Sequence, residues 1–200
     1  GRPMLSAGMM DRAKRNARYN VGSLIDYVAG GAKIVGLEPS CILSFRDDYK
    51  DLLPGVSGVN AVADSTMLID EFVTYAREKD GATLKFRRPP GKVLFHGHCH
   101  QKALGLVPPA RTLLERIPAV EVVDLDAGCC GMAGSFGYAH EHFELSRQIG
   151  ERRLLPVART LAPDEVLVAS GVSCRHQVLD LAGVSARHPA ELLASLLAPV

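Results

Sequence analysis

The stretch KVLFHGHC, residues 92–99, joins a short apolar run to residues that can carry chemistry. The same succession recurs in VEVVDLDAGCC, residues 120–130, and in VLVASGVSC, residues 166–174. Short apolar runs rich in β-branched residues predict buried strands, and apolar residues at helical spacing lie between them. Alternating strands and helices predict an α/β fold, with a parallel sheet of βαβ units and helices on both faces.

The preceding part of the chain follows a similar pattern. Residues 31–37 predict a strand, and a helix is expected from there to about Leu53, before Pro54-Gly55. Further helices are expected at 138–159 and 173–181. A polar, proline-rich connection at residues 79–91 predicts a boundary. The expected domains are therefore residues 1–84 and 85–200.

Composition narrows the class of protein. The chain has 200 residues, is 47% hydrophobic, and carries 23 basic against 22 acidic side chains. Without a basic excess, we expect no nucleic-acid partner. The apolar runs are too short to predict a transmembrane segment. The chain starts with Gly1 rather than Met and has no signal-peptide pattern, so we expect a piece of a larger cytoplasmic protein.

The positions of the five cysteines suggest a shared site. Each is expected just after a strand: Cys41 follows residues 31–37, and the other four, Cys99, Cys129, Cys130 and Cys174, follow the three later strands. Ligands of parallel sheets bind at the carboxyl ends of the strands. Thiolates are the ligands of soft metals and of iron–sulfur clusters, and a helix N-terminus near each cysteine would favour the thiolate. The sequence therefore predicts that four thiols converge to hold a metal centre.

Polar neighbours extend this candidate site. Glycines around the vicinal pair, Gly131 among them, let the backbone approach a bulky ligand. His98 and His100 could be ligands, or hydrogen-bond donors to sulfur or to substrate, and His176 also flanks a cysteine and is a candidate donor to the site. His96, at the end of its strand, is expected to pack in the core. Two cations, Lys102 and Arg175, could either offset negative charge at the site or lie in solvent.

Four signatures together resemble the cysteine-rich CCG family: GLEPSC at 36–41, HGHCHQK at 96–102, GCCGMAGSFG at 128–137 and GVSCRHQ at 171–177. That family includes the B subunit of heterodisulfide reductase, the iron–sulfur subunit of glycolate oxidase, the C subunit of anaerobic glycerol-3-phosphate dehydrogenase, and fused FAD proteins of the D-2-hydroxyglutarate and D-lactate dehydrogenase type. The fused type is the nearest resemblance. It implies pseudo-repeated CCG domains, with the end of one repeat in residues 1–84 and a complete repeat in 85–200.

The resemblance also implies cofactors and partners. It assigns an iron–sulfur cluster, [4Fe–4S], to Cys99, Cys129, Cys130 and Cys174, and makes Cys41 the last ligand of a first-repeat cluster. Five thiolates are not expected, because Glu38 and Gly171 stand where a Cys-x-x-Cys pattern would begin. The implied partners are an FAD-binding domain or subunit and an electron acceptor. The implied location is the cytoplasm, with a peripheral position at the inner membrane face as an option.

Two other functions remain open at this point. Four thiolates also suit structural zinc, which is a possible substitute in the same site. Cys129 and Cys130 could instead carry thiol–disulfide chemistry. The chain has no G-x-G-x-x-G fingerprint and no phosphate-binding loop, so FAD would belong to a missing part of the parent protein. We therefore expect no turnover by the isolated chain.

Overall fold

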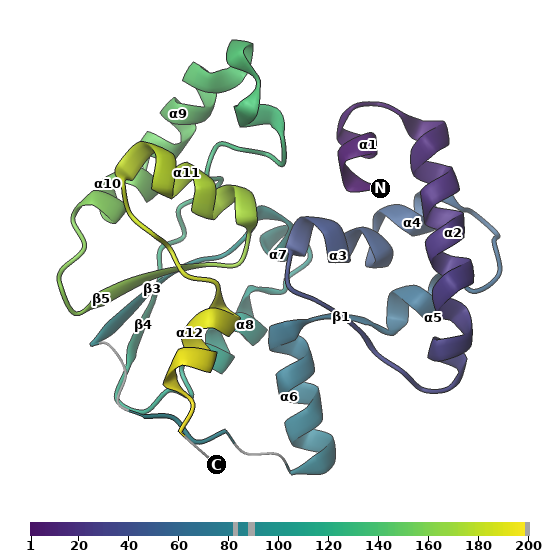
Figure 1. The fold of residues 1–200 in the computed structure, drawn as a ribbon, viewed down its shortest axis with the longest axis horizontal. Helices are drawn as coiled ribbons and strands as arrows, with labels where there is room; N and C mark the ends of the chain where they lie inside the picture. Colours follow the sequence, from purple (N-terminus) through teal and green to yellow (C-terminus); the bar gives the residue numbers. More distant parts are fainter. Residues whose placement is uncertain (82–83, 88–90, 199–200) are drawn as a thin grey trace. The chain divides into compact units, whose positions relative to one another are not determined.

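The computed structural model describes residues 1–81, 84–87 and 91–198 (Figure 1). It divides into two compact units, Gly1–Phe72 and Val73–Val200, which are described separately below. The expected end of the first domain was residue 84, and residues 88–90 of the expected connection lie outside the described part. The correspondence of these units to CCG repeats stays a prediction.

The first unit is mainly helical. Its elements are α1 (Arg2–Ser6), α2 (Met10–Ala29), β1 (Ile34–Gly36), α3 (Pro39–Arg46), α4 (Asp48–Leu52), α5 (Val59–Asp64) and β2 (Thr66–Leu68), and α6 (Ile69–Asp80) spans the division between the units. Strands β1 and β2 pair in parallel, with Ile34 opposite Thr66. The helix α2 buries Ala13, Ala17 and Val21, four residues apart, against α4 and α5. This spacing places the three side chains on one helical face.

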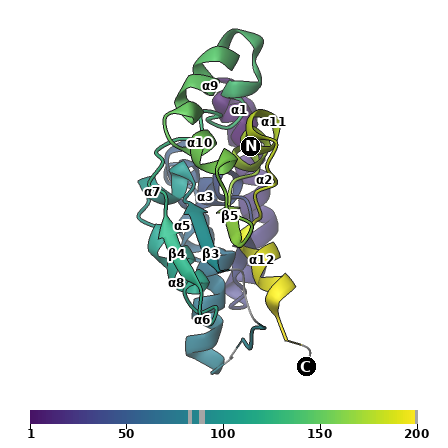
Figure 2. The same ribbon diagram turned by 90° about the vertical axis from the view of Figure 1, so that its left-hand side faces the viewer.

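The second unit is an α/β domain. Its elements are β3 (Lys92–His96), α7 (Cys99–Ala103), α8 (Val107–Leu114), β4 (Glu121–Asp124), the 3₁₀ turns η1 (Phe136–Tyr138) and η2 (His140–His142), α9 (Phe143–Glu151), α10 (Leu154–Arg159), β5 (Glu165–Ala169), α11 (Val172–Ala182) and α12 (Pro189–Leu196). The three strands are parallel in the order β4-β3-β5, and they lie side by side in Figure 2. The chain therefore runs from the central strand to one side and then crosses to the other.

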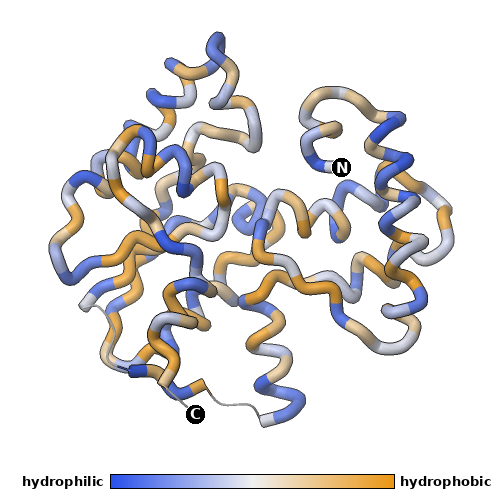
Figure 3. The backbone as a smooth tube through the Cα atoms, viewed as in Figure 1, coloured by the Kyte–Doolittle hydropathy of each residue, from blue (hydrophilic) through white to orange (hydrophobic). Residues whose placement is uncertain are grey.

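Hydrophobic residues cover both faces of this sheet. The strands are drawn mostly in orange in Figure 3. Because side chains alternate along a strand, Leu94 and Leu167 face α10 and α11, whereas Phe95 and Val168 face α8 and α12. The predicted α/β fold with helices on both faces is thus confirmed in the second unit.

Three local expectations were wrong. The helix expected to end at about Leu53 is divided into α3, which ends at Arg46, and α4, which begins at Asp48. Residues 138–159 do not form one helix, because α9 ends at Glu151 and α10 begins at Leu154. In a continuous helix, the ring of Pro156 would clash with the preceding turn and remove a hydrogen bond. Cys129 and Cys130 also do not lie at a helix N-terminus: they occupy a loop after β4, and the next α-helix starts only at Phe143. The described part of the chain holds no helix with the length and hydrophobicity to cross a membrane.

Candidate metal centre

The carboxyl ends of the three parallel strands carry the candidate ligands. His96 at the end of β3 pairs with Ala169 at the end of β5. Cys99 begins α7 directly after β3, and Cys174 is the third residue of α11 after β5. The loop after β4 supplies Cys129 and Cys130. All of these positions lie at the carboxyl ends of the strands, where α/β sheets bind ligands.

The four thiols of this unit form a connected chain. Neighbouring thiols shift one another's pKa: Cys129 shifts that of Cys99, Cys130 that of Cys129, and Cys130 that of Cys174. All four are free thiols. Solvent exposure falls from Cys99 to Cys174: Cys99 is exposed, Cys129 is half-buried, and Cys130 and Cys174 are buried. The structure therefore brings the four sequence-predicted cysteines together, with one end of the group open to solvent.

The pKa values of the four thiols are alternately raised and lowered from Cys99 to Cys174. The pKa of Cys129 is lowered because it accepts from the thiols of Cys130 and Cys99 and from backbone N–H groups. The pKa of Cys174 is lowered chiefly by the hydrogen bond from Cys130, with a further contribution from His96. Conversely, the hydrogen bond to Cys129 and burial raise the pKa of both Cys99 and Cys130. The arrangement therefore stabilises thiolate, the form of cysteine that binds metal.

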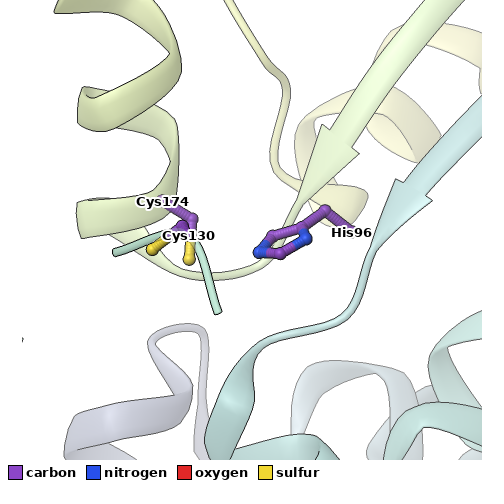
Figure 4. Close-up of side chains that lie close together, drawn as sticks. All are labelled: His96, Cys130 and Cys174. Carbon is purple, nitrogen blue, oxygen red and sulfur yellow. The ribbon is translucent and has the colours of Figure 1, made fainter. Parts of the chain in front are cut away.

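His96 lies against the buried end of this group. One of its ring nitrogens and the sulfurs of Cys130 and Cys174 all lie within 4.8 Å of one another. Figure 4 shows the ring pointing toward these two sulfurs. His96 is 1% exposed, and its Nδ1 atom has no hydrogen-bond partner in the described part of the chain. The sequence suggested only that His96 packs in the core. The structure places it in the core and also beside the two thiols.

The other polar candidates occupy different surroundings. The backbone N–H of Gly131 donates to Cys129 Sγ at 3.3 Å. His98 is buried, and Cys99 Sγ lies 3.9 Å from its Nδ1 and 4.0 Å from its Nε2. The His100 ring centroid lies 5.8 Å from that of His98. His176 is exposed, and its Nδ1 lies 2.7 Å from the hydroxyl of Tyr138.

A buried amide holds the cysteine loop in place. The Nε2 atom of Gln177 donates to Cys130 O at 3.2 Å and also to Ser146 in α9, at O and Oγ. Gly131 fits beneath α9 because any Cβ there would overlap the Ser146 carbonyl oxygen. Gln177 was not singled out from the sequence, although it lies within the GVSCRHQ signature. It positions the loop through backbone carbonyl and hydroxyl acceptors.

The two cations near the site bind backbone carbonyls. Lys102 Nζ donates to Gly128 O at 3.0 Å, and Arg175 donates to the carbonyls of Ala169 and Ser170 at 3.1 and 2.8 Å. Both side chains therefore brace the loops that carry the thiols. A cavity of about 480 Å³ opens beside Cys129; it is lined by Asp126, Ala127, Gly128, Cys129, Ile149, Arg152 and Arg153.

Cys41 belongs to the first unit. It is exposed and is the third residue of α3. At the start of this helix, Oε1 of Glu38 accepts from the backbone N–H of Ser40 at 3.4 Å and from its hydroxyl at 2.7 Å. The other four cysteines of the sequence all belong to the second unit.

Thiols gathered at the carboxyl edge of a parallel sheet define the second unit as an α/β domain suited to a soft metal or cluster. Comparison with known families agrees, because residues 93–178 match the family described as CCG, cysteine-rich domain. This segment of the second unit is therefore similar to that family.

Curated relatives cover nearly the whole chain. The C subunit of anaerobic glycerol-3-phosphate dehydrogenase from Escherichia coli K12 is 29% identical over 199 residues, which is 99% of this chain and 49% of that protein. D-2-hydroxyglutarate dehydrogenase from Pseudomonas putida KT2440 is 29% identical over 196 residues, 96% of this chain and 18% of that protein. The chain thus spans about half the length of the first relative and less than a fifth of the second. No solved structure matches the chain.

Proposed function

We propose that this chain is the electron-transfer part of an FAD-linked oxidoreductase, with an iron–sulfur cluster held by Cys99, Cys129, Cys130 and Cys174. The observation that carries the proposal is the connected chain of four thiols at one edge of the sheet. The matched relatives are named as dehydrogenases or as a dehydrogenase subunit. By analogy, the proposed substrate of the whole enzyme is a 2-hydroxy acid.

The donor set fits such a group. Iron–sulfur clusters take thiolate ligands, commonly four, and [4Fe–4S] is the proposed type. The N–H of Gly131 is already directed at Cys129 Sγ. Hydrogen bonds of this kind to ligand sulfur spread its negative charge, which raises a reduction potential. When bound, a cluster would supply one-electron transfer, and the residues of the chain hold it, shield its buried side and leave the Cys99 side open.

The proposed partners follow from what a relay requires. An FAD-binding domain or subunit would deliver electrons, and an acceptor would remove them. The cavity beside Cys129, with Arg152 and Arg153 in its wall, offers an approach for an anionic acceptor. Cys41 is the proposed ligand of a separate first-repeat cluster. A cytoplasmic location, with or without peripheral membrane contact, completes the proposal.

Structural zinc is the second candidate, and one observation favours it. His96 with Cys130 and Cys174 forms a compact set of nitrogen and sulfur atoms within 4.8 Å. Zinc binds tetrahedrally to mixed cysteine and histidine ligands, so a third thiol would complete the site. Thiol–disulfide chemistry through Cys129 and Cys130 is the third candidate, and it predicts reversible oxidation of this pair without any metal.

Metal analysis separates these functions. The chain is loaded anaerobically with iron and sulfide, assayed for both, and titrated with dithionite while visible absorption and paramagnetic resonance are followed. D-lactate, D-2-hydroxyglutarate and glycolate are then offered with a dye acceptor. We expect bound iron and sulfide, a reversible one-electron signal and no dye reduction. Stoichiometric zinc with no retained iron would establish the structural-metal function. Dye reduction would refute the proposal that the isolated chain transfers electrons without oxidising a substrate.

A further inference from the structure

The space beside Gly171 and Cys174 is filled by the side chain of His98. A Cβ built at Gly171 would lie 3.1 Å from Cys174 Sγ and 3.1 Å from His98 Nε2, and it would overlap His98 Cδ2. Gly171 has an ordinary φ of −76°, so its backbone could accept a side chain. The imidazole of His98 therefore makes glycine necessary here, and the ring lies where a residue-171 side chain would reach the sulfur of Cys174.

The hydrogen bonds of His98 decide which ring nitrogen carries the proton. His98 is the N-cap of α7, and its Nδ1 accepts from the backbone N–H of His100 at 3.1 Å. The backbone N–H of His98 in turn donates to Oε1 of Gln101 at 3.1 Å, which completes a capping box. A backbone N–H can only donate, so Nδ1 must be the acceptor of the ring. The neutral ring therefore holds its proton on Nε2.

The ring of His98 lies beside the sulfur of Cys174. His98 is 3% exposed, so water is largely excluded from the ring. The Cβ position of Gly171 is 3.1 Å from both Nε2 and Cys174 Sγ, which places the ring beside this sulfur. Cys99 Sγ lies 3.9 Å from Nδ1 and 4.0 Å from Nε2, so it is almost equally far from both nitrogens and lies off the Nε2–H direction. A neutral Nε2–H cannot offer a lone pair to a metal. His98 therefore acts on the site as a donor and not as a ligand.

We propose that His98 is a positioning residue whose Nε2–H group donates to the ligand sulfur of Cys174, and that Gly171 is glycine to admit its ring. This inference rests on the proposed iron–sulfur function. A donor at this point offsets negative charge on the thiolates without adding a fifth ligand. It thereby raises the reduction potential of the bound centre.

The main test replaces His98 with asparagine. His98→Asn keeps a good N-cap for α7 but removes the ring N–H. We expect iron and sulfide content to stay near that of wild type, the reduction potential to fall, and one exchangeable-deuteron coupling to disappear from the pulsed paramagnetic resonance spectrum. The matched control is His140→Asn, an exposed histidine of the same unit, which should change neither quantity. Unchanged potential and coupling in an iron-loaded His98→Asn chain would overturn the proposal and leave the relay function standing.

Two measurements test the geometry even in a chain that takes no iron, an outcome that refutes the proposed function instead. Nitrogen-15 spectra of histidine-labelled protein should show the Nε2–H tautomer for His98, and a proton on Nδ1 would overturn the assignment. In urea unfolding, Gly171→Ala should destabilise the wild-type chain much more than the His98→Asn chain. Equal losses in the two backgrounds would show that the ring does not fill this space.

Discussion

Cys41 and Cys174 occupy the same local setting in two different units. Each follows a parallel strand, each is preceded by serine, and each is the third residue of its helix, α3 or α11. Their surroundings differ completely. Cys41 is exposed and has no other cysteine in its unit, whereas Cys174 is 2% exposed and joins three further thiols.

The helix starts show what makes the difference. In α3 the N-cap is Glu38, whose own carboxylate satisfies the first turn through Ser40. In α11 the N-cap is Gly171, which has no side chain and leaves its space to His98 from another loop. A cysteine at the right offset from a strand is therefore not a site by itself. Neighbouring strands must deliver further ligands to the same edge.

The sharpest way to break this comparison is to exchange each cysteine for serine. Cys130→Ser should lose most of the iron retained after anaerobic reconstitution, because the hydroxyl is a poor ligand for a soft metal and Cys130 is central in the thiol chain. Cys41→Ser should retain iron near the wild-type level. Iron and acid-labile sulfide per chain are the quantities measured. Equal loss in both variants would instead indicate one site shared by five thiols.

The next largest effect is expected in the loop after β4 that carries Cys129 and Cys130. Gly131 has φ +102°, and a Cβ there would overlap the Ser146 carbonyl oxygen. Gly128 also has a positive φ, +68°, but its Cβ would meet nothing within 4 Å among the described residues. Gly131→Ala should cost at least about 3 kcal/mol and Gly128→Ala only about 1 kcal/mol in free energy of unfolding.

Denaturant unfolding measures these two free energies, and hydrogen exchange locates them. Gly131→Ala should weaken amide protection in β3 and β5 but not in α2, because Gly131 packs against Ser146 and Gln177 of its own unit. Similar losses for the two glycine variants would contradict the close packing of the loop against α9.

The smallest expected effect lies in the first unit. Burial raises the pKa of Asp70 from 3.8 to about 6, even though its carboxylate accepts from the backbone N–H of Glu71 at 3.1 Å. Between these two pH values the folded chain binds more protons than the unfolded chain, so stability contributed at Asp70 falls as pH rises through this range. Asp70→Asn, which keeps the acceptor oxygen, should therefore stabilise the chain at pH 7 by about 1–2 kcal/mol.

The Asp70→Asn gain should become small by about pH 3.5, where the carboxyl is mostly protonated in both states. Urea titrations of both chains at about pH 3.5 and pH 7 test this sign. A gain of the same size at both pH values would mean that the carboxylate charge is not the cause.

The strands of the second unit were predictable because short β-branched runs fit few alternatives. β3 occupies Lys92–His96, as its sequence suggests. The helix α2 was not predicted, since its buried face is built from Ala13 and Ala17, whose small side chains give a weak hydrophobic pattern. The helix α12 was also missed, because its N-cap is His188, a residue type uncommon in that role.

The candidate site was predictable to the level of strand ends and no further. Parallel topology brings loops after neighbouring strands together, so the cysteines could be grouped without a structure. The direction of His96 had a usable signal: it shares the strand face of Leu94, which packs in the same cluster as Cys130 and Cys174. The role of Gln177 had no such signal, because it depends on the tertiary approach of α9 to α11.

The site depends on the central position of β3 in the sheet. Cys99 and Cys174 come together only after β5, the last strand of the chain, pairs with β3 through the register that joins His96 to Ala169. The geometry that brings these two thiols together in the folded chain therefore depends on the pairing of β5 with β3. Occupation of the site and folding of the second unit are therefore thermodynamically linked, so that a bound metal or cluster stabilises β5 against unfolding.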